Sequence, residues 1–241
     1  MNLERPHHRA IWRILQALDN QFLQENNILF GGGTRIAMEL GEYRESVDLD
    51  LFCVGRGAYR AARSSIHSQT SFGSLFREGR APNLYGGREI RADRDAIRSI
   101  LEADGKPIKF ELIHFDSDEI VADHRTELFP VPCVSQESCF VTKLLANADR
   151  YRDTCKDIID LCMMYKEWGG VPSAAWQTAF SQYGEKVIMQ GLEQSLEALI
   201  NEVPQAIEVL VEDFQMAPGT AQTLVNETAV AWHRTLSSNA G

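Results

Sequence analysis

The chain has 241 residues and a formal net charge of −10, with 44% hydrophobic and 24% charged residues. This composition is typical of a globular protein with one large or two modest domains. No apolar run could span a bilayer and the first residues lack a hydrophobic signal region, so we expect a cytoplasmic protein. Five scattered cysteines without a CxxC pair indicate neither a disulfide framework nor a zinc site.

The charge is unevenly distributed along the chain. Residues 56–98 contain nine arginines and four acidic residues, a local charge of +5. Residues 157–241 contain eleven acidic and three basic residues, a local charge of −8. The net acidity argues against nucleic-acid binding over the whole surface, but an anionic substrate is expected near the first half of the chain. A solvated arginine-rich surface explains the charge equally well.

The first segments indicate an amphipathic helix followed by a short strand. Five apolar residues recur at helical spacing, which predicts a helix over residues 9–23: Ile11, Ile14, Leu15, Leu18 and Phe22. The adjacent His7 and His8 precede it in a polar stretch and are expected to be solvated. The run NILF, residues 27–30, then reads as a strand that stops at three glycines.

The next stretch, GGGTRIAMELGEYRESVDLDLF, combines a glycine turn with an Asp-x-Asp pair. A short helix is predicted over residues 34–40, with Thr34 as its N-cap and Gly41 as its stop. Residues 46–52 alternate strictly, which predicts a half-buried strand. Val47, Leu49 and Leu51 are expected on one face, with Ser46, Asp48 and Asp50 on the other.

Residues 56–115 are predicted to contain a helix and a hairpin. A helix over about residues 57–70 would align Arg56, Arg60, Arg63 and His67 on one face. Two strand-like runs joined by ADGK, within residues 96–115, give a hairpin signal. In the second run Lys109, Glu111 and Ile113 share a face opposite Phe110 and Leu112.

Beyond Pro132 nearly every segment has a helical pattern. We therefore predict two domains, residues 1–132 and residues 133–241. The first mixes helices and strands and the second is all helical.

The glycine stretch predicts a phosphate-binding turn, but not one of the two best-known kinds. A P-loop needs a lysine after its glycines, and the dinucleotide fingerprint needs glycine where Ile36 stands. Glycines and a helix N-terminus can still hold a triphosphate. The Asp48 and Asp50 carboxylates suit divalent cations, and a pair of Mg²⁺ ions could assist nucleotidyl transfer. Glu111, on a neighbouring strand, is the best-placed third ligand.

Several of these motifs resemble the nucleotidyltransferase superfamily of the DNA polymerase beta type, and more narrowly its AbiEii-like toxin branch. The resemblance lies in GGT at residues 32–34, YRESVDLDLF at residues 43–52 and IKFELI at residues 108–113. Two further family patterns follow, KLLANADR with Lys143 and Arg150, and KDIIDL with Asp157 and Asp160. Lys156 departs from the usual arginine, and Glu111 from a common aspartate.

The resemblance implies an α+β nucleotidyltransferase core with a small mixed sheet, followed by a helical domain that closes the nucleotide cleft. We expect Asp48, Asp50 and Glu111 to be catalytic metal ligands. Residues expected to bind the nucleotide are Gly32, Gly33, Thr34, Lys143, Arg150 and Asp157. The NTP is the expected substrate, which donates a nucleotide monophosphate to an acceptor hydroxyl.

The implied biological role is that of a toxin in a type IV toxin–antitoxin or abortive-infection system, with tRNA as an acceptor and a cognate antitoxin as partner. Two alternatives stay open at this stage. One is adenylylation of a small molecule such as an aminoglycoside. The other is a catalytically silent nucleotide-binding module, which the intact aspartate pair disfavours.

Overall fold

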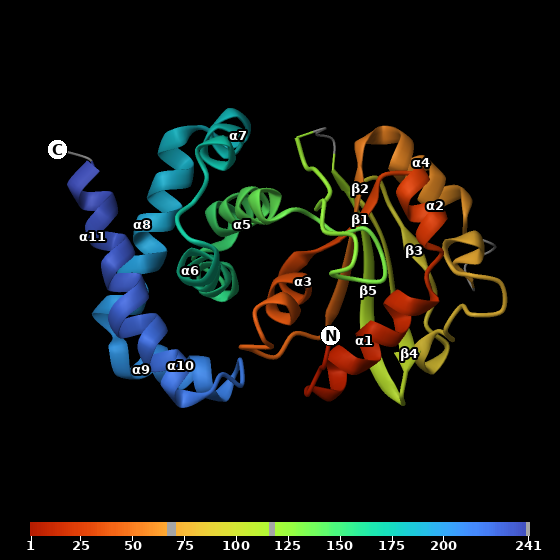
Figure 1. Ribbon diagram of the computed structural model, residues 1–241, viewed down its shortest axis with the longest axis horizontal. Coiled ribbons are helices and arrows are strands. Elements are labelled where there is room, and N and C mark those ends of the chain that lie inside the picture. Colours follow the sequence, from red (N-terminus) through yellow and green to blue (C-terminus); the bar gives the residue numbers. More distant parts are fainter. Residues whose placement is uncertain (67–70, 116–118, 240–241) are drawn as a thin grey trace. The chain divides into compact units, whose positions relative to one another are not determined.

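The computed structural model describes residues 1–66, 71–115 and 119–239 (Figure 1). Its contacts divide the chain into two compact units. Unit 1 comprises residues 1–39 and 46–135, and unit 2 comprises residues 40–45 and 136–241. The sequence placed residues 40–45 in the N-terminal domain, whereas their contacts group them with the helical unit.

Unit 1 is built on a five-stranded mixed sheet in the order β1-β2-β5-β4-β3. Strands β2 and β5 are parallel, and the other neighbouring pairs are antiparallel. The strands are β1 (Ile28–Gly31), β2 (Asp48–Val54), β3 (Arg91–Ala92), β4 (Ala96–Ala103) and β5 (Lys106–Phe115). The helices are α1 (Pro6–Ala17), α2 (Asn20–Glu25), α3 (Gly32–Glu39) and α4 (Gly55–Ser64), with short 3₁₀ turns η2 (Gly73–Leu75) and η3 (Tyr85–Gly87).

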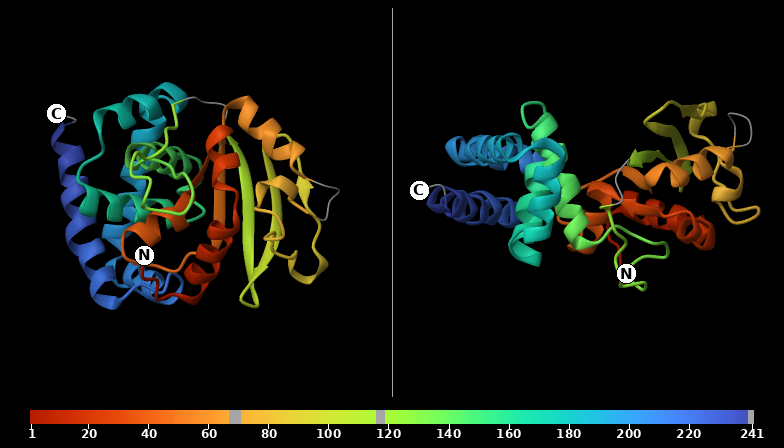
Figure 2. Two further views of the ribbon diagram at one scale, coloured as in Figure 1. Left: turned by 45° about the vertical axis from the view of Figure 1, so that its right-hand side comes forward. Right: turned by 90° about the horizontal axis from the view of Figure 1, so that it is seen from above.

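The predicted hairpin is confirmed as the long β4–β5 pair, which stands out in yellow-green in the left view of Figure 2. Asp104 and Gly105 form its two-residue turn, with φ of 54° and 70°. Positive φ at both positions matches the right-handed twist of the two strands. This turn sets the register from Ala103↔Lys106 along the whole hairpin.

One face of the sheet forms the core of unit 1. Leu49 and Leu51 of β2 and Phe110 and Leu112 of β5 are fully buried in it. Apolar residues of α1 and α4 join the same cluster, so these helices cover that face. The pleat therefore turns the alternate residues of β2 and β5 to the opposite face.

Several local predictions for unit 1 were wrong in detail. The first helix is two helices, because Asp19 starts α2 by accepting a hydrogen bond from the Phe22 backbone N–H at 3.0 Å. The alternation holds only from Asp48, where β2 begins: Val47 is 39% exposed and Ser46 is buried. His8 is fully buried rather than solvated. The helix predicted over residues 57–70 ends at Ser64, and His67 lies outside the described residues.

Unit 2 is helical apart from the segment 40–45. Its elements are α5 (Gln136–Arg150), α6 (Lys156–Trp168), α7 (Ser173–Tyr183), α8 (Glu185–Asn201), α9 (Val203–Glu212), α10 (Pro218–Thr223), the π-helical turn η4 (Leu224–Ala229) and α11 (Val230–Asn239). Helix α5 packs against α6, α7 and α8, and α11 packs along α8 (Figures 1 and 2). The predicted α+β class with a helical second part is thus confirmed. Within the described residues, no helix has the length and apolarity to cross a membrane.

Candidate active site

Two glycines bring the start of α3 against the Asp50 side chain. Gly31 pairs with Asp50 across β1 and β2, and Gly32 has φ of +72°. A Cβ on Gly32 would lie 2.1 Å from Asp50 Oδ2, and one on Gly31 would lie 2.6 Å from the Phe52 ring. Neither position can accept a side chain without moving its neighbour. The glycines therefore allow the Asp50 carboxylate to approach the first turn of α3.

Thr34 ties α3 to the first residue of β2. The prediction that it caps the helix was wrong, because α3 already begins at Gly32 and Thr34 is buried in its first turn. Its hydroxyl donates to the Asp48 carbonyl oxygen and lies 2.6 Å from Ser46 Oγ. The first N–H groups of a helix have no intrahelical partner, so this end of α3 offers the donors that a phosphate binds.

The aspartate pair and Glu111 lie on the same face of the sheet. In the parallel register, Asp48 pairs with Lys109 and Asp50 with Glu111. Side chains of paired residues on adjacent strands point the same way, so all four project from the face opposite the core. This confirms the predicted facing of Lys109 and Glu111. The face thus carries three carboxylates from two neighbouring strands.

Glu111 is held by two cations in this structure. Arg98 Nε donates to its Oε1 at 2.8 Å, and Lys109 Nζ lies 2.5 Å from its Oε2. Burial lowers the pKa of Lys109, but Glu111 and then Asp48 and Asp50 outweigh burial, so the net pKa is raised. The sequence did not single out Arg98, although the two-residue turn places it directly opposite Glu111.

The donor set fits a hard divalent cation. Magnesium is commonly bound by one or two carboxylates together with waters and substrate phosphates. Asp48 and Asp50 supply such a pair beside the helix start. Among the residues that the structure describes, no three His, Cys, Asp or Glu side chains gather closely enough to hold a metal by themselves. Glu111, the third carboxylate of this face, is bonded to Arg98 and Lys109.

A buried network of ion pairs joins α3 to the loop that contains Asp123 and Arg125. The guanidinium of Arg35 is fully buried, with Glu39 Oε2 at 2.5 Å and Asp123 Oδ2 at 3.3 Å. Arg125 contacts the same two acids at 3.0 and 2.5 Å. Charges buried in this way hold one geometry, because moving any member leaves another without its partner. No sequence pattern pointed to Asp123 or Arg125, which lie outside any regular element.

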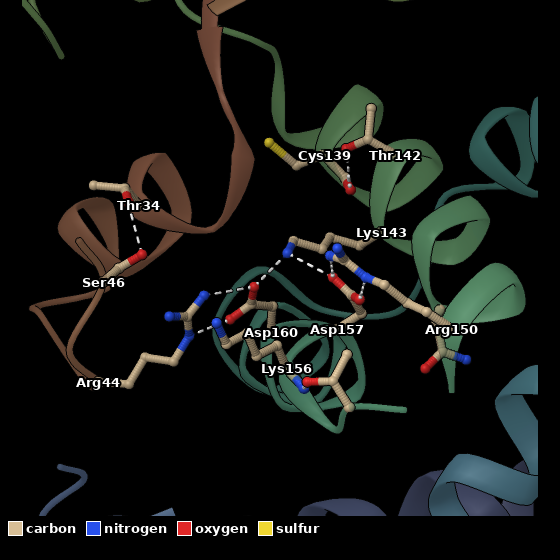
Figure 3. Close-up of polar contacts among 12 residues, drawn as sticks. Thr34, Arg44, Ser46, Cys139, Thr142, Lys143, Arg150, Lys156, Asp157 and Asp160 are labelled. Atoms are coloured by element: carbon tan, nitrogen blue, oxygen red, sulfur yellow. Dashed lines mark hydrogen bonds and ion pairs between the residues drawn. The ribbon is translucent and has the colours of Figure 1, made fainter. Parts of the chain in front are cut away.

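The other predicted nucleotide-binding residues form a second cluster, in unit 2 (Figure 3). Lys143 Nζ lies between Asp157 Oδ1 at 2.8 Å and Asp160 Oδ2 at 2.6 Å. Arg150 donates to both oxygens of Asp157 at 2.6 and 3.0 Å. Lys143 is 6% exposed, whereas the Arg150 side chain is half exposed. Their binding of a nucleotide stays a prediction.

The cluster is fully charged despite its burial. Burial alone would raise the pKa of Asp160, but Arg44 and Lys143 outweigh it and hold the pKa well below its ordinary value. For Asp157, Lys143 and Arg150 likewise outweigh burial and lower the pKa. Burial lowers the pKa of Lys143, and the two acids raise it above its ordinary value. All three groups therefore stay ionised near neutral pH.

Comparison with known proteins places the chain in a family. The family model described as nucleotidyl transferase AbiEii toxin, type IV TA system, matches residues 13–223. No curated protein is similar enough in sequence to count as a match.

Two solved structures share the fold. The crystal structure of JHP933 from Helicobacter pylori has a TM-score of 0.56 at 14% identity, covering 99% of this chain and 97% of that one. A candidate nucleotidyltransferase from H. pylori has a TM-score of 0.54 at 14% identity, covering 96% and 95%. The family match spans most of the sequence, including both motif clusters. The chain therefore belongs to the AbiEii family of nucleotidyltransferase toxins of type IV toxin–antitoxin systems.

Proposed function

We propose that this protein transfers a nucleotide monophosphate from a magnesium-bound NTP to an acceptor hydroxyl, with release of pyrophosphate. The observation that carries the proposal is the contact between the start of α3 and β2. Gly32 leaves room for the Asp50 carboxylate there, and Asp48 lies on the same strand face. A helix N-terminus favours the phosphates and the carboxylates favour the cations, so metal and triphosphate can share one place.

Each residue in unit 1 has a defined part in this proposal. Asp48 and Asp50 are the metal ligands, and Glu111 is a third ligand that helps to accept the proton of the acceptor hydroxyl. Gly32, Gly33 and Thr34 bind the β- and γ-phosphates through backbone N–H groups, since the Thr34 hydroxyl is already bonded to Ser46 and Asp48. When bound, Mg²⁺ would neutralise phosphate charge and activate the acceptor oxygen.

Lys143, Arg150 and Asp157 are proposed to contribute to triphosphate binding on the strength of the family pattern. Their cluster also includes Asp160 and Arg44, so it holds three cations and two carboxylates, a formal excess of one positive charge. Arg150 is the half-exposed member of the cluster, whereas Lys143 is buried between the two acids.

For the acceptor we propose a polyanion, with tRNA as the first candidate. Helix α4 has no acidic residue, and Arg56, Arg60 and Arg63 are all exposed. Tyr59 of α4 donates to the Asp93 carbonyl oxygen at 2.7 Å, and Arg63 donates to the same oxygen at 3.4 Å. These bonds join α4 to the β3–β4 hairpin, which carries the exposed arginines Arg91, Arg94 and Arg98. Clustered arginines of this kind bind phosphate backbones.

The biological proposal is a toxin that acts in the cytoplasm and is opposed by a cognate antitoxin, as the family implies. Expression of the active protein is then expected to stop growth, and co-expression of the antitoxin to restore it.

Transfer of label from NTP tests the catalytic proposal. Purified protein is incubated with Mg²⁺, each α-labelled NTP, and either total tRNA or small hydroxyl compounds such as aminoglycosides. Asp48→Asn and Asp50→Asn preserve side-chain shape, and Asp104→Asn is the matched control at an exposed turn that asparagine tolerates. We expect labelled tRNA with wild type and control only. Labelled small molecules alone would favour the first alternative, and no label on any acceptor would favour the silent module.

A further inference from the structure

The segment 40–45 joins α3 to β2 and is held by unit 2. Arg44 is buried and donates from Nε and Nη2 to the two oxygens of Asp160, at 2.6 and 2.9 Å (Figure 3). The Tyr43 hydroxyl donates to Asp160 Oδ1 at 2.5 Å, and the Glu45 backbone N–H donates to the Phe214 carbonyl oxygen at 2.9 Å. Three consecutive residues are therefore fixed by unit 2.

The chain runs directly from this anchor into the proposed metal-binding strand. After Glu45, the Ser46 backbone N–H donates to His8 Nε2 at 3.2 Å, and Ser46 Oγ lies 2.6 Å from Thr34 Oγ1. Asp48, the first residue of β2, follows two positions later. Only three residues, Glu45, Ser46 and Val47, separate Arg44 from Asp48. A linker this short cannot absorb a large shift at one end, so a displacement of Arg44 also displaces the start of β2.

We propose that Arg44 is a positioning residue for nucleotidyl transfer: its bidentate bond to Asp160 fixes the segment 40–45 and so sets the entry of β2 and the position of Asp48. A buried ion pair is an inefficient way to gain stability, because desolvation offsets most of the attraction. A planar guanidinium that donates to both oxygens of one carboxylate does, however, fix the orientation of the two side chains as well as the distance between them. The inference rests on the proposed function, because Asp48 must act in catalysis for its position to matter.

The cluster allows Arg44 to be removed without leaving an unpaired buried acid. In Arg44→Met, Asp160 keeps Lys143 Nζ at 2.6 Å and the Tyr43 hydroxyl at 2.5 Å. The apolar methionine suits the buried site. Asp160→Asn is the poorer test, because it leaves Arg44 buried with its main partner neutralised.

The experiment compares Arg44→Met and Arg44→Lys with wild type, and Arg13→Met serves as control. Arg13 pairs with Asp104 at the surface of unit 1, so its loss removes an Arg–Asp pair that makes no bond to the segment 40–45. Hydrogen exchange of the peptides covering residues 40–50 is followed by mass spectrometry, together with kcat and KM for label transfer. For Arg44→Met we expect faster exchange at residues 40–50, unchanged exchange in α5 and α8, and a kcat reduced by about 10- to 100-fold at a KM for NTP within about threefold of wild type.

Arg44→Lys is expected to recover part of kcat, because one ammonium replaces only part of the bidentate contact. Exchange at residues 40–50 equal to wild type in Arg44→Met would overturn the proposal, as would a kcat within about twofold of wild type. If Arg44→Met fails to fold, hydrogen exchange at residues 40–50 and kcat are measured on Arg44→Lys instead. Wild-type values of either in that variant would overturn the proposal. A wild-type protein without transfer would refute the proposed function. Faster exchange would then still show that Arg44 orders the segment, without a catalytic consequence.

Discussion

Gly32 and Asp50 are in contact where α3 meets β2: a Cβ at position 32 would lie 2.1 Å from the Oδ2 atom of Asp50. Gly32 also has a φ of +72°, in the left-handed region that disfavours any other residue. The position therefore requires glycine for two separate reasons, one set by its backbone and one by the Asp50 carboxylate.

Gly32→Ala is expected to remove activity beyond its effect on stability. Left-handed backbone costs a non-glycine residue about 1–2 kcal/mol, but the methyl group also displaces the Asp50 carboxylate. We expect label transfer to fall by about 100-fold or more, since small displacements of reacting groups have effects of this size. Initial rates at saturating NTP measure the loss.

Gly105→Ala is the matched control for that variant. Gly105 has φ of +70° in the β4–β5 turn, and a Cβ there would meet nothing within 4 Å. It should therefore lose a similar amount of stability in urea unfolding while keeping its activity. Equal activity losses in the two variants would mean that the contact with Asp50 is irrelevant.

Arg98→Met is expected to strengthen metal binding. Arg98 Nε donates to Glu111 at 2.8 Å, and because it pairs with Glu111 across β4 and β5 it adds a positive charge to the face that carries the two aspartates. Its removal frees a carboxylate oxygen and reduces repulsion of a cation by about 1 kcal/mol, which lowers the Mn²⁺ concentration for half-saturation by about fivefold. Titration followed by electron paramagnetic resonance measures free Mn²⁺. Arg94→Met, at a neighbouring exposed arginine, should leave the titration unchanged, and weaker binding in Arg98→Met would contradict the expectation.

Lys143→Met separates a structural role for Lys143 from a role in binding the nucleotide. Without Lys143, Asp160 keeps Arg44 at 2.6 Å and Asp157 keeps Arg150 at 2.6 Å, so both buried acids remain paired. We expect a folded protein whose KM for NTP rises by about tenfold, through loss of a phosphate contact worth about 1.4 kcal/mol. Circular dichroism verifies the fold. An unchanged KM would assign Lys143 to the structure of unit 2 alone.

Stability is expected to decline in acid because of Asp157 and Asp160. Both have pKa values below the ordinary value of 3.8 in the folded protein, so the unfolded chain binds protons first as the pH falls. The contribution of these two carboxylates to the free energy of unfolding is complete above their ordinary pKa. It is lost as the pH falls from there toward their lower pKa values in the folded protein. Each carboxylate then lowers the free energy of unfolding by up to about 1.4 kcal/mol per pH unit.

Urea unfolding between pH 6 and pH 3 measures this dependence. Arg44→Met should show a shallower decline below pH 4, because Asp160 loses one of the two cations that lower its pKa. A slope identical to wild type would mean that Arg44 contributes nothing to the ionisation of Asp160.

The sequence predicted the strands and the turn of the site better than the contacts between residues that are distant in the sequence. Alternation placed Asp48 and Asp50 on one face, and the ADGK signal located the β4–β5 turn. A two-residue turn also fixes register, so the pairing of Arg98 with Glu111 could have been read from the same signal. Both features depend on residues that are close in the sequence.

The burial of Arg44 and of His8 could not be predicted in this way. Arg44 meets Asp160, more than a hundred positions further along the chain, and His8 meets the Ser46 backbone. No local period marks an arginine whose partner lies in a distant helix. The same limit explains Val47 and Ser46, whose exposures reverse the alternation because β2 begins only at Asp48.

The most direct test of the central claim is metal-dependent NTP binding at Asp48 and Asp50. Calorimetric titration with a non-hydrolysable NTP is run with Mn²⁺ and with EDTA, on wild type and on the double variant Asp48→Asn, Asp50→Asn. We predict that wild type binds the NTP at least about tenfold more tightly with Mn²⁺, and that the double variant loses this difference. Equal binding by both proteins, unaffected by EDTA, would contradict the assignment of these aspartates to the metal site.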